Sequence, residues 1–202
     1  MKKSSILILI IICLVGCKKG SNETTITGEI KGLGTDTLYL YGMDELYDRI
    51  DTIYVENDKF SYTTSVDTIT SAYLLLKNRI EYPVFLDKGN KIKIKGDTIN
   101  LNFLTISGNI YNEEFTDFQK ALEDPADPSE KAGEETVDKR ITVEKANTAE
   151  EMAEEFILQH HSSYVSLYLL DKYFVQKETP DFSKIKKLVE VMTGVLQDKQ
   201  YI

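Results

Sequence analysis

No cysteine follows Cys17 in this chain of 202 residues, and the only other cysteine is Cys13. Disulfide bonds, thiol redox chemistry, a cysteine nucleophile and a cysteine-ligated zinc ion are therefore excluded from residues 18–202. This absence removes more classes of activity than any single motif of the chain suggests.

Histidines are nearly as scarce, since His160 and His161 are the only two. Neighbours in a helix point about 100° apart, so the two rings cannot share a metal ion as an i, i+4 pair would. We expect a helix to end near Ser162 instead. Acidic residues occur in scattered pairs such as Glu150 and Glu151, which we interpret as solvated faces. The sequence predicts no catalytic residue, no cofactor and no metal ligand.

Positive charge is also in deficit, because the chain has a formal net charge of −9. Nucleic-acid binding is excluded on this ground, since its affinity comes from basic groups that neutralise phosphates. Electrostatic attraction to anionic lipid is disfavoured for the same reason.

The first residues of the chain have the composition of an export signal. Lys2 and Lys3 precede an apolar run from Ile6 to Val15, which is too short for a membrane span of about 20 residues. The ending Leu14-Val15-Gly16-Cys17 resembles the lipobox of bacterial lipoproteins. That resemblance implies removal of residues 1–16 as a signal peptide and attachment of lipid to Cys17. Two or more acyl chains anchor a protein stably to a lipid bilayer.

Strand patterns dominate the sequence between the expected tether at 17–25 and residue 109. Short segments rich in β-branched and aromatic residues alternate with turn residues at spacings typical of a sandwich or barrel. Two turns, 56–59 and 87–90, are predicted to close hairpins because Asn, Asp and Gly tolerate positive φ. The expected strands are 26–30, 37–41, 50–55, 59–63, 72–76, 82–86, 91–95 and 104–107.

Helical periodicity begins near residue 110. A short amphipathic helix is expected over 113–122, then an acidic linker over 123–136, and Thr148 is predicted to open a second helix with a capping box. Pro180 and Asp181 introduce a last helix with an apolar stripe that includes Leu188 and Met192. The fold class is therefore α+β: an antiparallel β-sandwich-like domain over 26–109, then a helical region over 110–202.

The ordered β motifs resemble a known family. The motifs are 27–33, 36–41, 50–53 with 59–62, 85–89 with 92–97, and 107–109 followed by 112–115. They look like the β-rich domain of unknown function that precedes thioredoxin-like domains in envelope lipoproteins, which are thiol-disulfide oxidoreductases of the alkyl hydroperoxide reductase/thiol-specific antioxidant or TlpA-like type. Residues 156–160 and 163–167 are similar to the family's connector. The chain departs from that family in having no Cys-X-X-Cys pair, so no catalytic residue is carried over.

Three functions are compatible with these observations. The first is a non-catalytic accessory module of the cell envelope, anchored to the periplasmic or outer surface of a membrane through Cys17. The second is the N-terminal part of a lipid-tethered thioredoxin-like oxidoreductase, with the helical region contacting the thioredoxin-like domain as partner and the apolar stripe of the last helix left uncovered. The third is binding of an envelope glycan or peptide by tyrosines such as Tyr39 and Tyr41.

Overall fold

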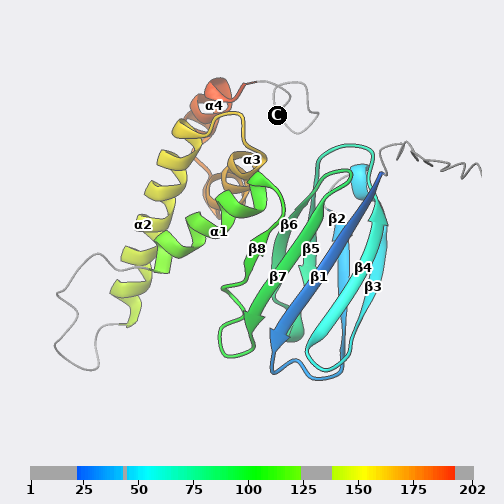
Figure 1. Cartoon of the computed structure of the whole chain (residues 1–202). Helices are drawn as coiled ribbons and strands as arrows, with labels where there is room; N and C mark the ends of the chain where they lie inside the picture. Colours follow the sequence, from blue (N-terminus) through cyan, green and yellow to red (C-terminus); the bar gives the residue numbers. More distant parts are fainter. Residues whose placement is uncertain (1–21, 43–44, 124–137, 194–202) are drawn as a thin grey trace, which may run out of the picture.

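The computed structural model describes residues 22–42, 45–123 and 138–193 (Figure 1). The predicted signal peptide over 1–16, Cys17 and most of the acidic linker lie outside these ranges. Where the chain is described, two four-stranded β-sheets face each other and are followed by helices, which confirms the predicted α+β class.

The first sheet has the strand order β4-β1-β7-β8 and the second has the order β3-β2-β5-β6. The strands are β1 (Glu23–Lys31), β2 (Asp36–Gly42), β3 (Ile50–Val55), β4 (Lys59–Ser65), β5 (Thr70–Leu75), β6 (Glu81–Leu86), β7 (Lys91–Asp97) and β8 (Thr105–Ser107). Every segment that was predicted as a strand overlaps one of these. Buried and exposed residues alternate along the strands of the first sheet and along β2 and β3 of the second, so the inward side chains form the core between the sheets. Strands β5 and β6 are buried along most of their length.

The pairing of the strands differs from the sequence prediction in two respects. The turn at 87–90 was expected to close a hairpin, but β6 and β7 belong to different sheets. The hairpin prediction at 56–59 is also wrong for most of its length, since β3 and β4 lie in different sheets and share only the bridge between Glu56 and Lys59. The sheets are not wholly antiparallel, because β1 runs parallel to β7 from Thr25 to Lys31.

The turn chemistry itself is confirmed. Asn57 and Asp58 have φ values of 51° and 68°, and Gly89 has a φ of 76°. Strand β1 also begins earlier than expected, at Glu23, because Thr24 is buried and its hydroxyl donates to the carbonyl of Asp87. The last residues assigned to the tether therefore belong to the sandwich.

The helices cover one side of the sandwich (Figure 1). They are α1 (Ile110–Glu123), α2 (Asp138–Gln159), α3 (Tyr164–Leu170), a π-helical turn η3 (Asp171–Val175) and α4 (Phe182–Val191), and 3₁₀ turns η1 (Glu45–Tyr47) and η2 (Lys77–Arg79) lie among the strands. The capping-box prediction at Thr148 is wrong, since α2 passes through that residue. The predicted break near Ser162 and the last helix after Asp181 are confirmed, with Ser163 and Asp181 as the N-caps.

Helix α1 closes the open side of the sandwich, where β6 and β8 are the edge strands of the two sheets. The buried Asn112 side chain accepts from the Phe85 N–H at 3.0 Å and donates to the Phe85 carbonyl at 2.8 Å. One turn later, the Thr116 hydroxyl accepts from the Ile106 N–H and donates to the Ile106 carbonyl, both at 2.9 Å. Both edges thus obtain from α1 the hydrogen bonds that a further strand would supply.

Candidate functional site

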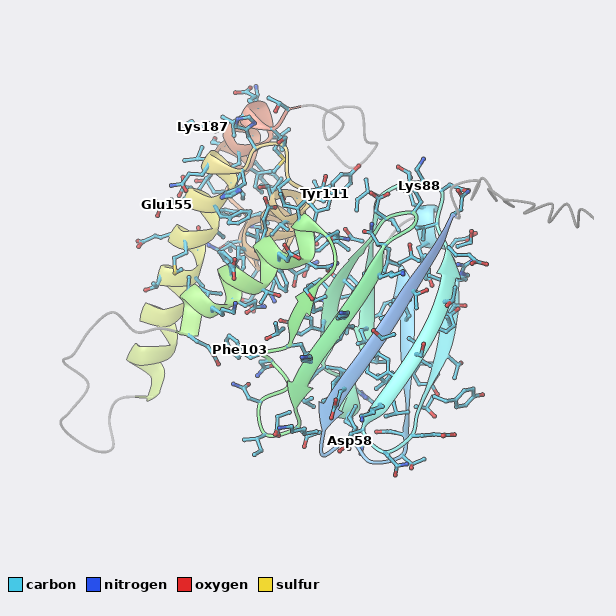
Figure 2. All side chains as sticks on the ribbon, in the orientation of Figure 1. Asp58, Lys88, Phe103, Tyr111, Glu155 and Lys187 are labelled. Atoms are coloured by element: carbon cyan, nitrogen blue, oxygen red, sulfur yellow. The ribbon has the colours of Figure 1, made fainter. Side chains whose placement is uncertain are left out.

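The entry of the chain into the sandwich lies five residues after Cys17. The Asn22 carbonyl accepts from the Val66 N–H at 3.0 Å, and the Asn22 amide donates to Asp67 at 2.8 Å. A fully extended chain of five residues spans at most about 18 Å, which limits the distance between Cys17 and Asn22. Lys88 lies at this end of the sandwich and Asp58 at the opposite end (Figure 2).

Below the entry point, a polar cluster crosses the end of the sandwich. Tyr47 of η1 donates to Asp51, the Arg49 Nε lies 3.1 Å from Asp51, and the Arg49 guanidinium also contacts Thr64 and stacks over the Tyr47 ring at 4.7 Å. Burial would raise the pKa of Asp51, but hydrogen bonds from Tyr47 and Tyr62 and the charge of Arg49 outweigh it and lower the pKa. Burial and Asp51 raise the pKa of Tyr47 to about 12. The groups satisfy one another, so this cluster stabilises the fold.

A groove of about 310 Å³ lies between α1 and α2. Its apolar lining consists of Phe118 and Ala121 on α1 and Met152 and Phe156 on α2. Phe118 is buried, whereas Met152 and Phe156 are half-buried. The polar lining is acidic except for Gln159 and His160 and consists of Glu114, Asp117, Glu155, Gln159 and His160. Among the residues that the structure describes, no lysine or arginine lines this groove.

His160 closes one end of this groove, which the sequence did not predict. Its ring stacks on Phe156, with centroids 4.2 Å apart and planes 10° apart, and its Nδ1 lies 3.4 Å from Glu114 Oε1. The partner was missed because Glu114 lies far away in the sequence, on α1. His161 points elsewhere and its Nδ1 pairs with the Thr193 hydroxyl at 2.8 Å.

The group formed by Glu114, His160 and Ser163 lacks the order of a catalytic triad. Ser163 donates to Glu114 and accepts from the Val165 N–H, so its hydroxyl caps α3 and pairs with the carboxylate. A serine nucleophile instead needs a hydrogen bond to an imidazole base. Over the described ranges, no three His, Cys, Asp or Glu side chains are arranged to hold a metal ion.

The acidic residues of α2 and the tyrosines of β2 lie on two different surfaces. The carboxylates of Glu150 and Glu154 on α2 pair with lysines: Glu150 with Lys177 at 2.6 Å, and Glu154 with Lys184 at 2.7 Å. Tyr39 and Tyr41 share the outer face of the β2 sheet, but Tyr41 stacks on the buried Tyr73 with ring centroids 5.8 Å apart. Of this pair, Tyr39 is the more open, with 41% of its surface exposed.

Comparison with known proteins gives a family-model match, which covers the sandwich and the start of α1. Residues 24–115 match the model of a family described as Domain of unknown function (DUF4369). The DUF4369 match starts in β1 and ends at Phe115 in α1. It confirms the coarser part of the resemblance, a β-rich domain of unknown function, whereas lipid attachment and association with thioredoxin-like domains stay predictions. A search of curated proteins finds no match to the chain.

The DUF4369 match includes Asn112 and Phe115, which join α1 to the sheets, and ends one residue before Thr116. Sequence reasoning missed this role of Asn112 and Thr116. The available signal was the position of two polar residues on the same face of α1 as the buried Phe115. No helix in the described part of the chain is both long and apolar enough to span a membrane.

Proposed function

We propose that this chain is a lipid-anchored lipoprotein of the cell envelope whose sandwich and helices form a non-catalytic interaction module. The observation that carries the proposal is Leu14-Val15-Gly16-Cys17 after a basic start and an apolar run. The short distance between this motif and the fold also supports the proposal, because β1 begins at Glu23, six residues after Cys17.

Metabolic labelling with an alkyne fatty acid tests the anchor in bacterial cells that express the full chain. We expect label on the native chain and its recovery with the membrane fraction. Cys17→Ala is expected to lose the label and to leave the membrane fraction. Cys13→Ala is the matched control, since it removes the other cysteine within the apolar run and should keep the label. Equal labelling of native chain and Cys17→Ala would contradict the proposal.

The non-catalytic part of the proposal is tested separately. Because no cysteine follows Cys17, the detergent-extracted protein should not reduce the disulfides of insulin. Reduction above the level of a heat-denatured sample would contradict the proposal.

The second candidate is the tethered part of a thioredoxin-like oxidoreductase, and the domain of unknown function over 24–115 is compatible with it. In the last apolar stripe Leu188 and Met192 are buried and Ile185 and Val189 are half-buried, whereas Phe182 is 77% exposed, so the stripe is covered only in part. Intact mass spectrometry of the protein extracted from its own membranes separates the two candidates. A mass equal to the 23.0 kDa chain minus residues 1–16 and plus acyl groups favours the first. A mass larger by a further domain of about 100–150 residues favours the second.

A further inference from the structure

Both walls of the groove between α1 and α2 follow the repeat of a helix. Glu114, Asp117, Phe118 and Ala121 are spaced i, i+3, i+4 and i+7 on α1. Met152, Glu155, Phe156 and Gln159 have the same spacing on α2. Such a groove presents parallel rows of side chains into which the ridge of a third helix packs.

The floor of the groove offers apolar surface that is only partly covered. Ala121 is exposed and Met152 and Phe156 are half-buried, although Phe156 already contacts Phe118 with ring centroids 5.6 Å apart. Burial of such surface contributes about 25 cal/mol per Å². A volume of about 310 Å³ accommodates a few apolar side chains of a partner.

The rim of the groove carries acidic side chains. Glu114 and Asp117 lie on the α1 side and Glu155 on the α2 side, where Figure 2 shows Glu155 reaching away from the sandwich. Asp117 has a lysine neighbour, Lys120, at 3.0 Å, and both side chains are largely exposed, so exchanging this pair for a basic residue of a partner costs little free energy. The net charge of −9 adds to the same negative potential.

From these three observations we propose that the α1/α2 groove binds an amphipathic, lysine- or arginine-rich helical segment of a partner protein. The apolar stripe of that segment covers Met152 and Phe156, and its basic residues face Asp117 and Glu155. An anionic lipid surface does not fit, because the rim repels it. The inference rests on the proposed role as an interaction module and specifies the chemistry of its partner.

Fluorescence anisotropy with the detergent-extracted full chain tests the groove. The probe is a synthetic helical peptide with leucines at i, i+3, i+4 and i+7 flanked by lysines. Two control peptides replace the lysines by glutamates or the leucines by serines. We expect binding of the first peptide only, with an affinity that falls as salt rises.

The decisive variant is the double reversal Asp117→Lys with Glu155→Lys, because both side chains are exposed and their replacement leaves the core intact. We expect binding to weaken at least about tenfold. The matched control, Asp48→Lys with Glu178→Lys, changes the net charge equally at exposed positions outside the groove and should bind as the native chain does.

Several outcomes would overturn the inference. They are equal weakening by both double variants, equal binding of the glutamate peptide, no binding of the lysine peptide at millimolar concentration, and self-association of the chain that the groove reversal abolishes. None of these outcomes changes fatty-acid labelling at Cys17, so a failure of the groove is distinguishable from a failure of the anchor.

Discussion

The sandwich and the helices α2 to α4 are held by different kinds of interaction. The sandwich is closed by buried hydrogen bonds from Asn112 and Thr116 on α1 to the edge strands. The later helices are attached through aromatic contacts at the centre and exposed ion pairs outside, such as Lys177 with Glu150. The chain changes from strand to helix at Ile110, yet α1 packs as the last element of the sandwich. The family match also continues past this change of secondary structure, into the first residues of α1 as far as Phe115.

The largest effect is expected where the two regions meet, at Phe115. This side chain is 1% exposed and contacts Tyr82 and Phe85 of the sandwich and Tyr168 of α3, with ring centroids 5.3–6.3 Å apart. Phe115→Ala should lower the free energy of unfolding by about 3–5 kcal/mol. Urea denaturation followed by circular dichroism and tyrosine fluorescence measures this, and both probes should shift together.

Phe182→Ala is the control for Phe115→Ala, because 77% of the Phe182 surface is exposed. It should change the free energy by no more than about 0.5 kcal/mol. If Phe115→Ala shifted only the helical signal, the helices would unfold independently and the view that α1 belongs to both regions would be wrong.

The next effect concerns the sandwich alone, at Asn112. Asn112→Ala removes the side-chain acceptor of the buried Phe85 N–H, whereas the Phe85 carbonyl keeps the Asn109 amide at 2.9 Å. The variant should therefore cost about 1–3 kcal/mol. Hydrogen exchange at the Phe85 amide should accelerate in the variant by a matching factor. Lys120→Ala, on the exposed side of the same helix, is the control and should leave that amide protected. Unchanged exchange in Asn112→Ala would show that α1 does not seal the edge.

A smaller, pH-dependent effect is expected at Asp51, at the end of the sandwich. Its pKa is lowered below the ordinary 3.8, because hydrogen bonds from Tyr47 and Tyr62 and the charge of Arg49 outweigh the effect of burial. A lowered pKa stabilises the fold above the pKa of the unfolded chain, and this stabilisation is lost as pH falls through the folded value. Asp51→Asn should therefore cost about 1–2 kcal/mol at pH 7 and progressively less below pH 4.

Thermal unfolding at pH 7, 5 and 3 measures the Asp51→Asn effect. The exposed Asp48→Asn serves as the control and should show little change at any of the three pH values. A cost for Asp51→Asn that stays constant from pH 7 to pH 3 would show that the interaction does not depend on the charge of Asp51.

Local patterns predicted the elements of both regions well but not their partners. Short segments rich in β-branched and aromatic residues located the strands that the structure describes, and Asn57, Asp58 and Gly89 marked real turns. The same turns do not reveal whether the next strand pairs with its predecessor or crosses to the other sheet. That choice depends on long-range packing: β6 is buried along nearly its whole length, so it is covered on both faces and hydrogen-bonded at its edge by α1.

The candidate sites show the same limit. His160 stood out in the sequence, but its partner Glu114 comes from a different helix and could not be found from spacing. Thr148 has the sequence of a capping box, yet those residues are also compatible with a helix interior, and α2 continues through them. The roles of Asn112 and Thr116 depend on the edges of β6 and β8, which pack against α1. The local pattern of the helix does not contain this information.

The smallest effect is expected in the helical region, at Glu150. Its hydrogen bond with Lys177 lowers its pKa, and burial opposes this while Lys184 supports it. The side chains are partly exposed, so Glu150→Gln should cost no more than about 1 kcal/mol and almost nothing in 1 M salt. Urea denaturation at low and high salt checks this, with Glu178→Gln as a control at an exposed position. A loss of more than about 2 kcal/mol, well above an ordinary surface pair, would mean that charge, rather than the aromatic contacts of Tyr168, attaches α2 and α4 to the rest of the protein.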